Sequence, residues 1–164
     1  MTYDEAEDIL LDYDLYSLGY CITKKDWGFI DKIIKEYKIK TMVEFGSGIS
    51  TLLLDEKVKM ISYETDDVYA YAMNQIREFD IRLWDGKTID LKEKFDLVFI
   101  DGPADGEERE VPIKIASEIS DLVLVHDGGR PFESLWQERH LTNFKLIRNG
   151  GTRNCNLWQR IINF

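Results

Sequence analysis

The sequence predicts one α/β domain over residues 1–164, built on a doubly wound, mostly parallel sheet with a terminal antiparallel strand pair. Short apolar segments alternate with amphipathic segments along most of the chain, which is typical of parallel strands joined by helices. The apolar segments are nearly continuous in hydrophobic residues, as strands covered on both faces are. The last two segments have no helix between them, which indicates antiparallel pairing. A length of 164 residues leaves little room for a second domain.

Composition excludes several classes of protein. Hydrophobic residues make up 44% of the chain, which indicates a globular rather than a disordered protein. The net charge of −10 repels phosphate backbones and no run of basic residues offsets it, so we predict no nucleic-acid partner. No apolar run approaches the roughly 20 residues of a membrane span, so we predict no membrane partner. The first basic residue is Lys24, which leaves no basic n-region for a signal peptide and predicts a cytoplasmic protein.

The N-terminal part of the chain predicts two helices. Residues 1–22 mix six acidic residues with apolar and aromatic ones and predict a short helix over 3–11, either a solvated cap on the domain or a flap over the site. Thr23 can cap the second helix, with Asp26 at the third position supporting its first turn. The apolar residues of this helix recur at helical spacing: Trp27, Ile30, Ile33, Ile34 and Tyr37.

The remaining elements follow from the same patterns. Parallel strands are predicted over 41–45, 59–64, 81–83, 95–100 and 121–126. Helices are predicted over 50–54, 66–79, 111–120 and 132–140, the first of them starting at Ser50 or Thr51. One apolar face is predicted for helix 66–79, made of Val68, Tyr71, Ala72, Ile76 and Phe79. The antiparallel pair is predicted at the sheet edge over 144–148 and 154–162, which completes a Rossmann-like order of elements.

Every predicted parallel strand has glycine or a polar residue at or close to its carboxyl end. In chain order these residues are Gly46, Glu64, Asp85, Asp101 and His126-Asp127. Ligands of such sheets bind beyond the carboxyl ends of the strands, so these residues are candidates for a site. Glu44 and Glu64 are twenty residues apart, which places Glu64 at the tip of the second strand beside the Gly46-Ser47-Gly48 turn. A glycine turn lets a ligand approach the backbone, and a carboxylate beside it can accept hydrogen bonds from ribose hydroxyls. The pattern predicts a nucleoside-cofactor site.

These strand ends resemble the motif positions of the class I S-adenosylmethionine-dependent methyltransferases over about residues 41–131. The terminal antiparallel pair resembles that family too. The resemblance implies that the cofactor is S-adenosylmethionine. It further implies that Glu44 and the Gly46-Ser47-Gly48 turn hold its methionine part, Glu64 its ribose hydroxyls and Asp85 its adenine amine, with Asp101 near the sulfonium and the acceptor. Ser50 stands where that family usually has a third glycine.

A narrower resemblance lies in Asp101-Gly-Pro103, Arg109 and the segment from Val125 to Glu133. It is to small O-methyltransferases of the branch that includes the plant glucuronoxylan 4-O-methyltransferases, and it implies a hydroxyl acceptor on a small molecule or a saccharide. This chain is shorter than the plant enzymes. Arg109 and Arg130 are predicted to bind an acidic acceptor, for example through a uronic acid carboxylate. Alternatively, they order loops by pairing with Glu107, Glu108 or Glu133.

Transfer of a methyl group to a hydroxyl needs a general base within about 3 Å of the hydroxyl proton. Asp101, His126 and Asp127 are the candidates, and the unperturbed pKa of histidine, about 6.5, suits His126 to the reaction. Alternatively, His126 holds its loop by a backbone hydrogen bond. Asp101 and Asp127 could also hold a divalent cation. Some cation-dependent O-methyltransferases have Asp-Asn at the second position, but Gly128 replaces the Asn here, so no metal is predicted.

Two other functions remain open from the sequence. The glycine turn and Glu64 are compatible with a nicotinamide-binding oxidoreductase, although a substrate domain is missing and the terminal pair breaks the parallel pattern. The Ser50 departure and the small size are compatible with an inactive module of the same fold that binds the cofactor or a partner protein, although four strand ends keep an acid. A homo-oligomer is compatible with either.

Overall fold

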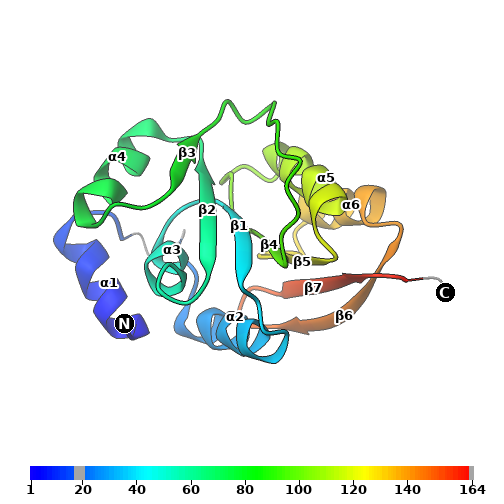
Figure 1. Cartoon of the computed structure of the whole chain (residues 1–164), viewed down its shortest axis with the longest axis horizontal. Helices are drawn as coiled ribbons and strands as arrows, with labels where there is room; N and C mark the ends of the chain where they lie inside the picture. Colours follow the sequence, from blue (N-terminus) through cyan, green and yellow to red (C-terminus); the bar gives the residue numbers. More distant parts are fainter. Residues whose placement is uncertain (17–20, 163–164) are drawn as a thin grey trace.

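The computed structural model describes residues 1–16 and 21–162, and their centre is a seven-stranded sheet. The strands lie in the order β3-β2-β1-β4-β5-β7-β6 (Figure 1). Their bounds are Thr41–Phe45 for β1, Lys59–Glu64 for β2, Ile81–Leu83 for β3, Leu97–Ile100 for β4, Leu122–Val125 for β5, Phe144–Gly150 for β6 and Cys155–Arg160 for β7. The first five strands are parallel, and β7 pairs antiparallel with both β5 and β6. The predicted fold class is confirmed.

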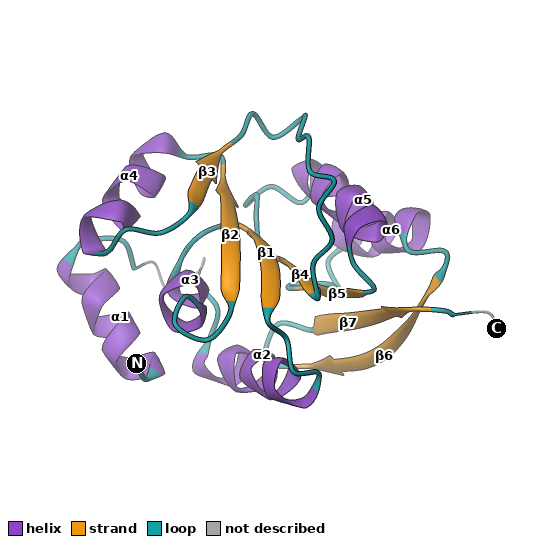
Figure 2. Cartoon of the chain, in the orientation of Figure 1, coloured by secondary structure: helices purple, strands orange, loops and turns teal. Residues whose placement is uncertain are grey.

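Helices cover both faces of the sheet (Figure 2). Their bounds are Tyr3–Asp12 for α1, Lys24–Glu36 for α2, Ile49–Leu54 for α3, Asp67–Ile76 for α4, Glu110–Ile119 for α5 and Pro131–His140 for α6, with a 3-10 turn η1 at Glu107–Arg109. Successive strand residues point to opposite faces, so Met42 of β1 joins the core under α1, α2 and α3 while Val43 joins the core under α5. None of the helices among the described residues is both long and apolar enough to cross a membrane.

Helix α2 has its predicted cap, and helix α3 begins earlier than predicted. The Thr23 hydroxyl accepts from the Asp26 backbone N–H at 3.2 Å, and the Asp26 carboxylate accepts from the Thr23 N–H at 2.9 Å, as predicted for α2. Helix α3 begins at Ile49 with Gly48 as its cap, one residue before the earlier of its two predicted starts. Its first turn is tightened because the Thr51 hydroxyl accepts from the Gly48 N–H at 2.9 Å.

Helix α4 and strand β4 differ from the predicted elements in bounds or face. Helix α4 ends at Ile76, because Arg77 turns to an extended conformation. Its buried residues are Ala70 and Met73, whereas Val68, predicted on the apolar face, is 73% exposed. Tyr71 is 69% exposed as well, so the predicted face was wrong by part of a turn. Strand β4 begins at Leu97, two residues later than predicted, because Phe95 makes only an isolated bridge with Ser120.

Candidate active site

A cavity of about 750 Å³ lies beyond the carboxyl ends of the parallel strands, where ligands bind in this class of sheet. This volume is in the range of small-molecule and cofactor sites. Its wall combines the turn after β1, the end of β2, and the loops that follow β4 and β5. The predicted site residues on this wall are Gly46, Ser47, Gly48, Glu64, Asp101, Arg109, Asp127 and Arg130. The other three, Glu44, Asp85 and His126, do not line it.

The glycine turn after β1 packs against a second glycine in the loop after β4. Gly46 has a φ of +93°, which favours glycine, and a Cβ added there would lie 2.7 Å from the backbone nitrogen of Gly102. A Cβ added to Gly102 would lie 2.7 Å from the Cα of Gly46. The two backbones meet without side chains between them, and both glycines lie on the cavity wall. The sequence indicates Gly46 but not the need for Gly102, because the contact joins distant segments.

Glu64 ends β2 directly beside the glycine turn, where the sequence spacing placed it. Its Oε2 accepts from the Ser47 N–H at 2.9 Å and from the Ser47 hydroxyl at 2.8 Å. Its Oε1 accepts from the backbone N–H groups of Thr65 and Asp66, at 2.8 and 3.1 Å. These four hydrogen bonds fix the carboxylate at the cavity wall and link the turn after β1 to the tip of β2.

Glu44 lies beneath the turn rather than in the cavity, so its predicted direct contact with a ligand is corrected. Its side chain is fully buried, and its Oε2 accepts from the hydroxyls of Thr51, at 2.6 Å, and Ser62, at 2.9 Å. The Thr51 hydroxyl in turn accepts from the Gly48 N–H. Glu44 therefore supports the turn from below. Burial raises its pKa to about 7, against the smaller opposing effect of its hydroxyl partners.

This buried acid predicts a stability that falls as pH rises. Between pH 4.5 and about 7 the unfolded chain loses the Glu44 proton and the folded chain keeps it, so the unfolded state binds fewer protons. We expect the free energy of unfolding of the wild type to fall by about 3 kcal/mol across this window relative to Glu44→Gln. Urea unfolding of both proteins at pH 5 and pH 8 measures it. Exposed Glu78→Gln serves as the control, and a difference equal to that of the control would contradict the prediction.

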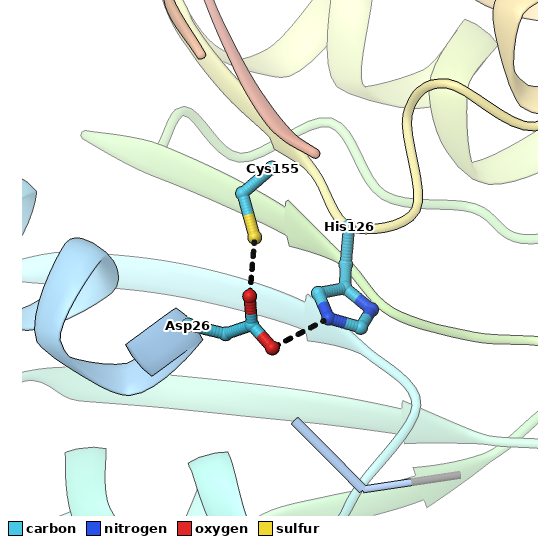
Figure 3. Close-up of side chains that lie close together, drawn as sticks. All are labelled: Asp26, His126 and Cys155. Carbon is cyan, nitrogen blue, oxygen red and sulfur yellow. Dashed lines mark hydrogen bonds and ion pairs between the residues drawn. The ribbon is translucent and has the colours of Figure 1, made fainter. Parts of the chain in front are cut away.

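His126 lies fully buried behind the cavity wall, surrounded by carboxylates. Its Nε2 is 3.6 Å from Asp26 Oδ2 (Figure 3). Its Nδ1 is 2.6 Å from Asp101 Oδ1 and 3.4 Å from Asp127 Oδ2. Burial alone would lower the His126 pKa, but the charge of Asp101 and the contacts with all three carboxylates outweigh it and raise the pKa to about 11. The ring therefore carries its second proton near neutral pH and has no free nitrogen for a substrate proton. The predicted role of His126 as the base stays a prediction, which the burial of the ring and this charge state disfavour.

Asp101 and Asp127 are the acids that reach the cavity from this cluster. Burial would raise the pKa of Asp127, but His126 and the Arg130 and Arg109 charges hold it below its usual range. Asp127 has a φ of 55°, a conformation that few residues other than glycine adopt, and such strain concentrates at functional sites. The following residue, Gly128, is fixed because its N–H donates to the Asn154 carbonyl at 3.0 Å.

Arg109 and Arg130 differ in what they offer the cavity. Arg109 is buried, and its guanidinium donates to the carbonyls of Pro103 at 2.7 Å, His126 at 3.1 Å and Asp101 at 2.7 Å. It therefore orders the loops after β4 and β5, while its predicted binding of an acidic acceptor stays a prediction. Arg130 lies at the rim with its side chain 45% exposed, where its Nη2 is 2.6 Å from Asp127 Oδ2. Its predicted contact with an acceptor stays a prediction.

Asp85 lies on an exposed loop away from the cavity wall. Its Oδ1 accepts from the backbone N–H groups of Lys87 and Thr88, both at 2.8 Å, and holds a tight turn. The predicted contact of Asp85 with adenine stays a prediction. The neighbouring Trp84 does line the cavity, although it is largely buried.

The N-terminal segment contributes to the cavity wall through residues that sequence analysis did not select: Asp14, Leu15, Tyr16, Cys21 and Ile22. This placement agrees better with a flap over the site than with a solvated cap. Residues 17–20 of that segment lie outside the described residues. No sequence signal distinguished these positions, because the acidic residues of 1–22 suggest a solvated surface.

Two groups of side chains come close enough for one cation among the described residues. The ligand atoms of Asp101, His126 and Asp127 lie within 4.8 Å of one another, as do those of Asp26, His126 and Cys155. In the second group, the Asp26 carboxylate already accepts four hydrogen bonds. The absence of a metal stays a prediction.

Comparison with known proteins supports the fold. No family model and no curated protein matches the chain. A Klebsiella pneumoniae protein assigned to the O-methyltransferases has a TM-score of 0.71 at 13% identity, covering 98% of this chain and 90% of its own. The O-methyltransferase of Bacillus cereus in complex with SAH has a TM-score of 0.67 at 12% identity, with the same coverage of 98% and 90%.

A third solved structure is that of a methyltransferase for RNA. It is the 16S rRNA methyltransferase RsmC of T. thermophilus, in complex with AdoMet and guanosine. It has a TM-score of 0.54 at 12% identity, and the match covers 76% of this chain but only 36% of that protein. Identities this low show a shared fold and leave the acceptor open, so the chemistry rests on this chain's own residues.

Proposed function

We propose that this protein is an S-adenosylmethionine-dependent methyltransferase that acts on a hydroxyl group of a small molecule or a saccharide. The observation that carries the proposal is one cavity whose wall contains the Gly46-Ser47-Gly48 turn, the Glu64 carboxylate beside it, and two acids at neighbouring strand ends. The fold shared with methyltransferases, two of which are complexes with SAH or AdoMet, supports it. The narrower relation to the glucuronoxylan branch stays a prediction.

The cavity fits such a cofactor by its own geometry. The approach of Gly46 to Gly102 leaves backbone at the wall where a Cβ would fill the space. The four hydrogen bonds to Glu64 use its lone pairs, but rotation of the Ser47 hydroxyl frees Oε2 to accept from a ribose hydroxyl. When bound, the sulfonium supplies an activated methyl group.

Asp101 is the proposed general base. Both Asp101 and Asp127 line the cavity, but Asp127 also pairs with Arg130 at 2.6 Å, which helps to hold the Asp127 pKa below its usual range. Asp101 faces His126 through Oδ1, which leaves Oδ2 to take the proton of the acceptor hydroxyl. Asp127 and Arg130 are then proposed to orient the acceptor at the rim.

The charges of the wall favour an acceptor without negative charge. Arg109 is committed to backbone carbonyls and Arg130 to Asp127, so neither is set aside for an acceptor carboxylate. The acceptor side also carries Asp105 and Glu108. Together with the net charge of −10, these acids oppose a phosphate backbone and favour a neutral polyhydroxy compound over a nucleic acid or a uronic acid.

The test of the cofactor is calorimetric titration with S-adenosylmethionine, S-adenosylhomocysteine and NAD. We expect the two sulfur nucleosides to bind and Glu64→Ala to weaken both at least tenfold, because the carboxylate loses its hydrogen bonds to ribose. Glu78→Ala, an exposed acid outside the cavity, serves as the control. Binding of NAD alone would favour the oxidoreductase alternative. Binding without turnover on any acceptor would favour the inactive module.

A further inference from the structure

A row of alternating charges leads from the first turn of α2 to the cavity. Asp26 and His126 are both fully buried, and Asp101 continues the row to the cavity wall. The contacts are Asp26 Oδ2 to His126 Nε2 at 3.6 Å and His126 Nδ1 to Asp101 Oδ1 at 2.6 Å. These residues come from three distant parts of the chain. Asp26 does not touch the cavity.

Asp26 is held from two sides. Its Oδ2 accepts from the N–H and the hydroxyl of Thr23, at 2.9 and 2.6 Å. Its Oδ1 accepts from the backbone N–H groups of Thr152 and Arg153 in the turn between β6 and β7, at 2.6 and 3.2 Å. A buried carboxylate needs such partners together with a counter-charge, and the His126 ring supplies the counter-charge. Burial opposes ionisation of Asp26, yet His126 and its donors hold its pKa well below the usual range.

The His126 ring has a carboxylate beyond each of its nitrogens. Asp26 of α2 faces Nε2, while Asp101 after β4 and the adjacent Asp127 face Nδ1. Two other titratable groups lie nearby. Cys155 of β7 lies beyond Asp26, with its Sγ 3.8 Å from Asp26 Oδ1. Arg109 donates to the backbone carbonyl of His126 and not to its ring. An imidazole with anions beyond both nitrogens holds two protons and is positively charged, so it forms an ion pair with Asp101.

We propose that Asp26 is a positioning residue, which holds His126 as a cation so that the ring fixes the Asp101 carboxylate at the cavity wall. The inference rests on the proposed function, because Asp101 is the proposed base. Asp26 touches neither cofactor nor acceptor and acts only through His126. Without its charge, the ring gives up its second proton more readily and Asp101 loses the ion pair that sets its orientation.

The charge state of the ring can be measured without any cofactor. The chain has two histidines, so His140→Gln leaves the His126 ring as the single histidine signal in an NMR pH titration. We expect this ring to stay doubly protonated to about pH 10, and to titrate at least one pH unit lower when Asp26→Asn is added. A ring that titrates near pH 6.5 in the presence of Asp26, or that is unaffected by Asp26→Asn, overturns the proposal.

A matched variant separates this charge from the capping of α2. Thr23→Val removes a hydroxyl donor from Asp26 but keeps the carboxylate beside His126. We expect Thr23→Val to lower the melting temperature while His126 titrates as in the wild type. If Thr23→Val shifts the titration as much as Asp26→Asn does, the effect comes from the cap and the proposal fails.

The effect on Asp101 has its own readout, which needs no acceptor. A fixed Asp101 carboxylate attracts the cationic sulfonium of S-adenosylmethionine but not the neutral sulfur of S-adenosylhomocysteine. We expect the preference for S-adenosylmethionine over S-adenosylhomocysteine to change at least threefold in Asp26→Asn and to be unchanged in Thr23→Val. If Asp26→Asn does not fold, His126→Gln tests the same step, and an unchanged preference overturns the proposal.

Failure of the proposed function gives a different result. In that case the wild type binds neither sulfur nucleoside, while the ring titration still reports whether Asp26 controls His126. If an acceptor is found, we expect Asp26→Asn to lower kcat at least tenfold with little change in KM. In the pH–rate profile of this variant, the decrease in rate at alkaline pH would also begin at a lower pH than in the wild type. A purely structural defect would not cause this shift.

Discussion

Replacing Asp101 with Asn is expected to reduce methyl transfer by about 10²–10⁴-fold and to weaken the binding of S-adenosylmethionine by about threefold or more, because the sulfonium loses a facing negative charge. An amide has nearly the same shape as the carboxylate but cannot accept the acceptor's proton at neutral pH. Asp101 reaches the cavity, and its Oδ2 is not the oxygen nearest His126. Single-turnover transfer from labelled cofactor to the acceptor measures the loss, and calorimetry measures the affinity.

Asp105→Asn is the matched control for this prediction. Asp105 lines the same cavity from the same loop, but its Oδ1 accepts from the Glu107 N–H at 2.9 Å and it makes no ion pair with His126. We expect its rate to stay within about threefold of the wild type. An Asp101→Asn rate above one tenth of the wild type would remove Asp101 from the role of base and direct attention to Asp127.

Replacing Gly46 with Ala is expected to lower the free energy of unfolding by about 2–5 kcal/mol and to abolish cofactor binding. The added Cβ would lie 2.7 Å from the backbone nitrogen of Gly102, so neither segment can yield by turning a side chain. The φ of +93° adds strain to any residue with a Cβ. Urea unfolding and calorimetric titration measure the two effects.

Gly28→Ala is the control, because it is also a glycine but lies inside α2 with nothing within 4 Å of the added Cβ. We expect this variant to be about 0.5–1 kcal/mol more stable than the wild type, since alanine loses less backbone freedom in a helix. Equal stability changes in the two variants would show that the contact between Gly46 and Gly102 is not what constrains the turn.

The sequence predicted the sheet better than the helices that cover it. The bounds of β1, β2 and β3 match their predicted ranges. β1 and β2 were recognisable because a buried parallel strand is an apolar run with glycine or a polar residue at its end. The face of α4 was mispredicted, because its apolar residues outnumber those that the sheet can cover. Val68 and Tyr71 were left in solvent for this reason.

The site was predictable where strand geometry decides it and not where a contact joins distant segments. Glu64 and Asp101 lie on the cavity wall because parallel strand ends meet at one edge of the sheet. Asp26 was recognised as a helix-capping residue, but its approach to His126 brings together positions a hundred residues apart. Arginine is a residue type that often binds ligands. Only the hydrogen bonds of Arg109 to three backbone carbonyls show that it orders loops.

The position of β7 has a consequence for how the protein is made. β7 is the last strand in chain order, yet it lies between β5 and β6 rather than at the sheet edge. During synthesis, the edge of β5 therefore stays unpaired until residues 155–160 leave the ribosome. The contact between Asp26 and Thr152 spans 126 residues and forms at the same late stage. Long-range pairing of this kind slows folding, so we expect the loop that carries Asp127 to become ordered only after synthesis has passed β7.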